Sequence, residues 1–180
     1  KNYFLALKTK PFVILAGISG TGKSKLVKLF AEAVGATSEN GRFSLIPVRP
    51  DWSDPSDLLG YKDINGMFQP GPLTNIIKDA EDDNTNRPYF VCLDEMNLAR
   101  VEYYFSDILS VMETREKDIE KQRIVTDGIF KKEFFGSDIK AYEKYGKLYL
   151  PDNLYIIGTV NMDETTFPFS KKVLDRANTI

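Results

Sequence analysis

The segment GISGTGKS at residues 17–24 constrains the fold of this chain more than any other feature. An apolar run at residues 12–16 precedes it, and apolar residues recur at helical spacing after it. A strand, a glycine-rich loop and a helix are the context that a phosphate-binding loop of the Walker A pattern G-x-x-x-x-G-K-[ST] requires. The segment fits that pattern without a mismatch, and the predicted nucleotide-binding residues are Gly17, Ser19, Gly20, Thr21, Gly22, Lys23 and Ser24.

The chemistry of phosphate binding explains this spacing. Glycines let the backbone curl so that successive N–H groups point at phosphate oxygens, and the following helix presents its positive end to the same anion. Lys23 is then expected to reach the β and γ phosphates, and Ser24 to supply a hydroxyl to Mg²⁺, a cation that prefers oxygen ligands. The alternative is a glycine-rich turn that only resembles the motif.

A second apolar run, at residues 89–93, ends in Asp94 and Glu95. Acids at a strand end after a Walker A loop indicate a Walker B motif. Asp94 would anchor Mg²⁺ through its waters, and Glu95 would orient or deprotonate the water that attacks the phosphate. Paired acids can also serve only as helix-capping charges. Cys92, in the middle of this run, is interpreted as a small buried apolar residue.

Composition limits the remaining possibilities. The chain has 180 residues, of which 42% are hydrophobic and 28% charged, as is ordinary for one soluble globular domain. A net charge of -2 gives no global attraction to nucleic acid, although a local basic patch stays possible. The lack of histidine excludes His bases and His metal ligands, and a single cysteine excludes an internal disulfide. No apolar run approaches a membrane span and no signal peptide is evident, so we expect a cytoplasmic protein.

Three further segments carry a family resemblance. They are VRPDWSDPSDLLGYKD, DEMNLARVEYYFSDIL and GTVNMDETTFPFSKKVLDRANTI. Together with the two Walker motifs they resemble the McrB family of AAA+ proteins, the NTP-hydrolysing subunits of modification-dependent restriction systems, from about residue 11 to the end. The resemblance implies an α/β P-loop NTPase fold, the AAA+ large subdomain, with a parallel sheet covered by helices on both faces and β-hairpin insertions. It also implies ATP or GTP as substrate with Mg²⁺, a ring expected to be hexameric, DNA, and an McrC-like nuclease partner.

The resemblance gives a role to the segment GTVNMDETT, which follows the apolar run LYII. In AAA+ proteins the strand between the two Walker strands ends in a polar residue near the γ-phosphate and the attacking water, and Asn161 is assigned this sensor role. The alternative is a strand end that needs only turn and cap residues. The better-known McrB proteins carry M-N-T-A-D, and here Glu164 stands where the family has Asp, so GTP selectivity is left open.

Two insertions agree with the same clade. Asn65 and Gly66 predict a hairpin turn within GYKDINGMFQPGPL, and residues 122–150, with a further turn expected at Asp127 and Gly128, form the second insertion. Their aromatic and lysine side chains either contact DNA or serve cross-strand packing and solvation.

Arg176, in VLDRANTI after a short helix predicted from Ser170, is the expected arginine finger. In a ring it would reach the neighbouring subunit's site and stabilise charge on the transferred phosphoryl group. The alternative is a surface ion pair with Asp175 or Glu164.

The chain as a whole, residues 1–180, is predicted to be one domain and a fragment of a longer protein, without the helical lid or a domain that recognises modified DNA. Two other functions stay open. One is a MoxR-like or dynein-related ATPase that remodels proteins, and the other is a nucleotide-gated scaffold that hydrolyses slowly.

Overall fold

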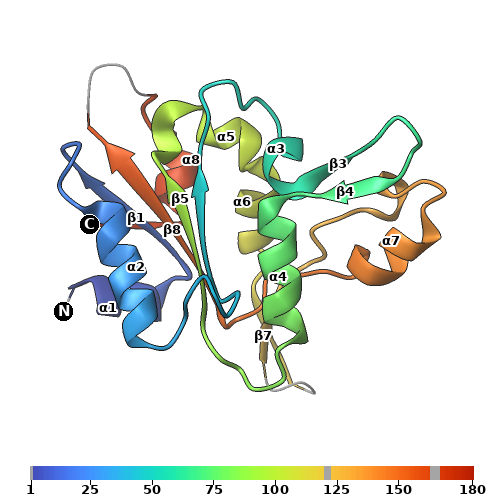
Figure 1. Ribbon diagram of the computed structural model, residues 1–180, viewed down its shortest axis with the longest axis horizontal. Coiled ribbons are helices and arrows are strands. Elements are labelled where there is room, and N and C mark those ends of the chain that lie inside the picture. The colour runs from blue at the N-terminus through green and yellow to red at the C-terminus, as the bar shows by residue number, and fades with distance from the viewer. Residues whose placement is uncertain (1, 120–122, 163–166) are drawn as a thin grey trace.

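The structure is a computed structural model that describes residues 2–119, 123–162 and 167–180. Within these residues, five parallel strands form the main sheet in the order β2-β5-β8-β1-β9 (Figure 1). Their bounds are β1 Phe12–Gly17, β2 Phe43–Pro47, β5 Tyr89–Asp94, β8 Leu154–Asn161 and β9 Asn178–Thr179. The predicted α/β fold with a parallel sheet is confirmed.

Helices cover both faces of the sheet, as Figure 1 shows. One face carries α1 Asn2–Thr9 and α2 Lys23–Ala33. The other face carries α3 Ser56–Leu59, α4 Pro72–Asp82, α5 Val101–Tyr104, α6 Ser106–Met112 and α8 Lys171–Leu174. The short 3₁₀ helix η1 Met96–Leu98 follows β5 after a single residue, Glu95.

Each face of the sheet has its own apolar core, and this explains the unbroken apolar runs in the sequence. Val13 and Leu15 of β1 pack with α1 and α2 in one buried cluster. Phe12 and Ile14 of the same strand belong to the second cluster, with α3 to α6. Because successive side chains of a strand point to opposite faces, a strand covered on both faces must be apolar throughout.

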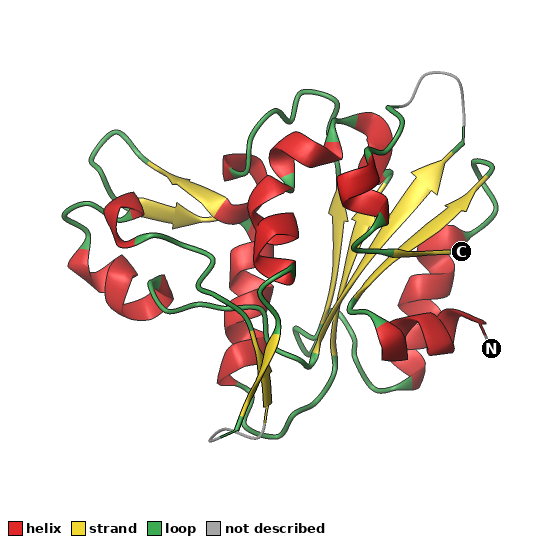
Figure 2. Cartoon of the chain, turned by 180° about the vertical axis from the view of Figure 1, so that it is seen from behind, coloured by secondary structure: helices red, strands yellow, loops and turns green. Residues whose placement is uncertain are grey.

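Two small antiparallel hairpins stand off from the main sheet, as Figure 2 shows from behind. The first consists of β3 Gly60–Lys62 and β4 Phe68–Pro70, and Asn65 and Gly66 lie in its turn as predicted. The second consists of β6 Glu116–Asp118 and β7 Arg123–Val125. It is followed by η2 Lys132–Phe134 and α7 Ile139–Tyr145.

The two insertions pack against each other through Phe68, which is 6% exposed. Four aromatic rings of the second insertion surround Phe68 with centroid distances of 5.3–5.5 Å, and they belong to Phe130, Phe134, Phe135 and Tyr145. Asp138 accepts hydrogen bonds from the backbone N–H groups of Phe68 (2.9 Å) and Ala141 (3.0 Å), so one carboxylate joins the first hairpin to the start of α7. These rings therefore serve packing and are not exposed for stacking on bases.

The expected turn at Asp127 and Gly128 is wrong. The backbone N–H of Asp127 donates to the hydroxyl of Thr114 (2.8 Å), at the end of α6, so this tertiary contact holds the segment instead of a hairpin. Helices α1 and α7 were not predicted. Among the described residues, no helix has the length and apolarity needed to cross a bilayer.

Gly158 of β8 gives a test of this packing, because a Cβ there would overlap the buried sulfur of Met96. We expect Gly158→Ala to lower the free energy of unfolding by about 1–3 kcal/mol, the usual cost of overpacking a core. Gly128→Ala is the matched control, since its nearest neighbours would be 3.8 and 3.9 Å away. Thermal unfolding measures both variants, and equal stability of the two would contradict the packing described here.

Candidate nucleotide site

The loop between β1 and α2 has the backbone shape that its sequence predicts. Gly20 and Gly22 have φ angles of 77° and 79°, in the left-handed region that favours glycine. The side chain of Lys23 turns back over the loop, and its Nζ donates to the carbonyls of Gly17 (3.1 Å) and Ile18 (2.8 Å). The ammonium group therefore lies against the concave backbone that would receive a phosphate.

The start of α2 faces the same place. Gly22 precedes the helix and offers no capping side chain, so the N–H groups of the first turn are left for another acceptor. The hydroxyl of Thr21 donates to the Ile18 carbonyl (2.8 Å) and braces the loop, while Ser19 is exposed on it. The predicted binding residues are thus brought together at the carboxyl end of β1.

The first Walker B acid, Asp94, ends β5 beside this loop. Its Oδ1 is hydrogen-bonded to the hydroxyl of Ser24 and also accepts a hydrogen bond from the hydroxyl of Thr159 (2.7 Å). Thr159 in turn accepts from the backbone N–H of Glu95 (3.0 Å) and is 1% exposed. One buried hydroxyl of β8 therefore fixes both acids of the Walker B pair.

The second acid, Glu95, adopts an unusual backbone conformation. Its φ of 53° and ψ of 47° place it in the left-handed region, which costs a residue other than glycine about 1–3 kcal/mol. Its Oε1 accepts a hydrogen bond of 2.6 Å from Nδ2 of Asn161, the last residue of β8. The structure thus brings the predicted base and the predicted sensor residue into direct contact.

The sequence did not identify two residues that contact the predicted site residues, Thr159 and Asn97. Asn97 is 3% exposed, and its Nδ2 donates to the carbonyl of Asn161 (2.9 Å). The signal for Thr159 was available, because residues two apart on a strand share a face, which places Thr159 beside Asn161. Asn97 carried no such signal, since only the folded chain brings η1 against the end of β8.

Cys92 is completely buried in the middle of β5, as predicted. Burial, together with the nearby Asp94, raises the pKa of the Cys92 thiol to about 12. The thiol therefore stays protonated at neutral pH and is not a nucleophile.

Arg176 does not join the site within one chain. It precedes β9, whose Asn178 pairs with Val13 near the start of β1. Arg176 therefore lies near the amino-terminal ends of the strands, whereas the phosphate-binding loop lies at their carboxyl ends. Its Nε donates to the carbonyl of Leu109 (2.9 Å), and its guanidinium forms an ion pair with Glu113. The alternative partner Asp175 is therefore wrong, and Glu164 lies outside the described residues.

A comparison with family models gives the chain a class. The model described as AAA domain (dynein-related subfamily) matches residues 12–177, and no curated protein matches the chain. The matched region contains the phosphate-binding loop, the paired acids and the end of β8. The chain therefore belongs to the dynein-related subfamily of AAA domains, a class of nucleotide-hydrolysing ATPase domains with Mg²⁺ as their usual cofactor.

Proposed function

We propose that this domain is the motor core of an McrB-type restriction system, which assembles into a ring and acts on DNA with an McrC-like nuclease. Family membership already gives nucleotide hydrolysis in general. The single observation that carries the catalytic part is the 2.6 Å hydrogen bond from Asn161 to Glu95, beside the contact between Ser24 and Asp94. In the proposed mechanism, this arrangement would supply a base, a neutral hydrogen-bond donor and two oxygen ligands at one end of the sheet.

Binding of the triphosphate would rest on residues 17–24. The loop N–H groups and the first turn of α2 would hold the phosphates, and the ammonium of Lys23 would leave the carbonyls of Gly17 and Ile18 for a phosphate oxygen. This exchange replaces two neutral acceptors by a charged one.

The oxygen atoms of Ser24 and Asp94 fit Mg²⁺, because this cation prefers oxygen ligands and keeps several of its waters. The described residues contain no group of three or more His, Cys, Asp or Glu side chains that could hold a metal by themselves. Phosphate oxygens and waters would therefore complete the coordination. When bound, Mg²⁺ neutralises charge on the phosphates.

Glu95 would act as the general base toward the attacking water. The amide of Asn161 holds one carboxylate oxygen, and the other accepts no hydrogen bond from the described residues. That second oxygen can take a proton from a water. A positioned base of this kind contributes roughly 10²- to 10⁴-fold in rate.

The McrB-type role is supported by the motifs GTVNMDETT and LDRANTI and by the two insertions that project together from the sheet. DNA contacts would come from the assembled ring or from domains beyond this chain. The resemblance links GTP selectivity to the position of Glu164, and this residue lies outside the described residues.

The proposal is tested by steady-state hydrolysis of ATP and GTP by the full-length protein, with and without modified DNA and the candidate nuclease. We expect the nuclease to stimulate turnover, and Glu95→Gln to reduce turnover while nucleotide binding is kept. Hydrolysis that responds to neither DNA nor nuclease would contradict the restriction role and favour protein remodelling. Full turnover by Glu95→Gln would contradict the catalytic assignment.

Thr159→Val tests the buried hydroxyl that fixes the Walker B acids, because valine keeps the shape and removes both hydrogen bonds. Groups that orient a metal ligand are usually worth 10- to 100-fold in metal affinity. We therefore expect the Mg²⁺ concentration for half-maximal hydrolysis to rise by about 10- to 100-fold. Thr159→Ser keeps the hydroxyl and should stay close to wild type. Identical Mg²⁺ curves for all three proteins would rule out this role.

The variant Arg176→Ala tests whether Arg176 is the arginine finger. In the assembled ring we expect nucleotide binding to be kept and hydrolysis to fall by roughly 10³- to 10⁵-fold. Glu113→Gln removes the ion pair that engages Arg176 within the chain, so hydrolysis by this variant should equal or exceed that of wild type. If Arg176→Ala hydrolyses at the wild-type rate, the finger is another residue.

A further inference from the structure

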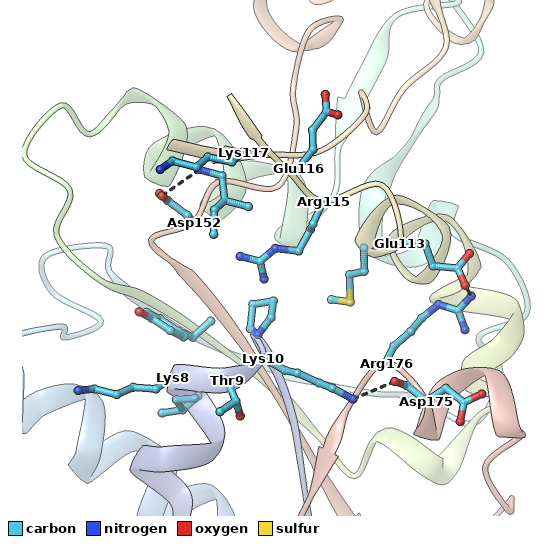
Figure 3. A pocket seen from close by; sticks show the side chains of 15 residues that line it. Lys8, Thr9, Lys10, Glu113, Arg115, Glu116, Lys117, Asp152, Asp175 and Arg176 are labelled. Atoms are coloured by element: carbon cyan, nitrogen blue, oxygen red, sulfur yellow. Dashed lines mark hydrogen bonds and ion pairs between the residues drawn. The ribbon is translucent and has the colours of Figure 1, made fainter. Parts of the chain in front are cut away.

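A cavity of about 790 Å³ lies at the amino-terminal edge of the main sheet, away from the phosphate-binding loop (Figure 3). Its walls come from the junction of α1 and β1, the end of α6 with β6 and β7, the start of β8, and the turn between α8 and β9. Its volume is in the range of small-molecule sites. No residue of the phosphate-binding loop or of the Walker B pair lines it, whereas Arg176, the proposed arginine finger, does.

Arg115 is the unusual group in this cavity. It lies between α6 and β6, and Figure 3 shows its guanidinium pointing into the space. The side chain is half-buried, and this burial lowers the pKa of Arg115, while the carboxylate of Asp152 opposes the shift. The guanidinium makes no hydrogen bond or ion pair with any residue in the described part of the chain.

A half-buried guanidinium without a hydrogen-bond acceptor costs free energy of folding. A guanidinium has five N–H donors, and partial loss of water without a replacement acceptor destabilises the fold. Two other cations of the cavity, Arg176 and Lys10, are already bound within the chain. Arg176 is bound to Leu109 and Glu113, and Nζ of Lys10 donates to the carbonyls of Asp175 (2.9 Å) and Ala177 (3.2 Å). Lys8 and Lys117 also line the cavity, but both are exposed and keep their water. Among the described residues, Arg115 is therefore the half-buried cation of the cavity whose donors lack a hydrogen-bond acceptor.

The charge balance of the walls selects the kind of acceptor. The walls carry five cationic and four acidic side chains, which leaves a formal charge of +1. One positive charge suits a singly charged anion better than a polyphosphate or nucleic acid. A carboxylate carries one charge and matches the guanidinium fork with two parallel hydrogen bonds. Leu7, Met112 and Tyr155 offer an apolar wall to the rest of the ligand.

We infer that this cavity binds an apolar carboxylate whose head group pairs with Arg115. The carboxylate belongs either to a free organic acid or to an acidic residue of a neighbouring polypeptide, which present the same chemistry. The inference does not rest on the proposed restriction role, because the pairing uses Arg115 and no residue of the chain's own nucleotide site. Arg176 shares the cavity, but Leu109 and Glu113 hold its guanidinium.

The test uses the full-length protein, with hexanoate and phenylacetate as probes in isothermal titration calorimetry. We expect Arg115→Met to weaken probe binding by at least about tenfold, the value of one charged hydrogen-bonded pair. Arg115→Lys keeps the charge without the fork and should also weaken binding. Lys131→Met removes the same charge from an exposed site outside the cavity and should bind the probes as wild type does.

Stability provides the second readout. Because no described residue forms a hydrogen bond with the side chain of Arg115, Arg115→Met should unfold at the same temperature as wild type or higher. A clear fall in unfolding temperature would make Arg115 a structural residue and overturn the inference.

Sedimentation velocity with nucleotide distinguishes the two sources of the carboxylate. If neither probe binds but Arg115→Met weakens assembly by tenfold or more, while Lys131→Met does not, the carboxylate belongs to a neighbouring polypeptide. If the probes do not bind and assembly is unchanged, the cavity is not a carboxylate site.

Discussion

The chemistry of this domain depends on the parallel pairing of β8 between β5 and β1. The register pairs Leu93 with Gly158 and Gly17 with Asn161, so the carboxyl ends of the three strands meet at one place. A shift of one residue would turn Thr159 and Asn161 to the opposite face of the sheet. The backbone hydrogen bond from Met162 to Gly17 (3.2 Å) continues this pairing into the phosphate-binding loop. The register therefore sets the distances between the phosphate-binding loop, the proposed metal ligands and the proposed base.

Within that register, the left-handed backbone conformation of Glu95 directs its carboxylate toward Asn161. A residue leaving β5 in an extended conformation would continue the strand, whereas the turn at Glu95 brings its carboxylate to Asn161. Thr159 accepts the N–H of Glu95, and Asn97 holds the carbonyl of Asn161. These contacts offset the local strain, as is common where backbone strain is kept at a functional position.

The sequence was informative wherever function requires adjacent residues. The phosphate-loop residues, the two acids and Asn161 could be proposed from sequence because each lies in a short contiguous pattern at a strand end, and the structure brings them together. Asn97 was missed because its contact with Asn161 joins segments about 64 residues apart along the chain, whereas Thr159 shares a strand face with Asn161 and could have been predicted. The turn at Asp127 was wrong for a related reason, since a contact with Thr114 outweighed the local preference for a hairpin. The partner of Arg176 was likewise set by packing on α6 and not by its neighbours in sequence.

The insertions show how the same limit applies to larger units. Each insertion could be predicted separately. Their packing against each other, through Phe68 and Asp138, could not be predicted because it joins residues far apart in the sequence. In the proposed mechanism, hydrolysis depends on the contact between Asn161 and Glu95. A double-mutant cycle on kcat tests this most directly, with Glu95→Gln, Asn161→Ala and the double variant. If Asn161 acts by holding the base, its loss should matter little once Glu95 is replaced, giving a coupling energy of about 1.4 kcal/mol or more. Independent, multiplicative losses would contradict the account.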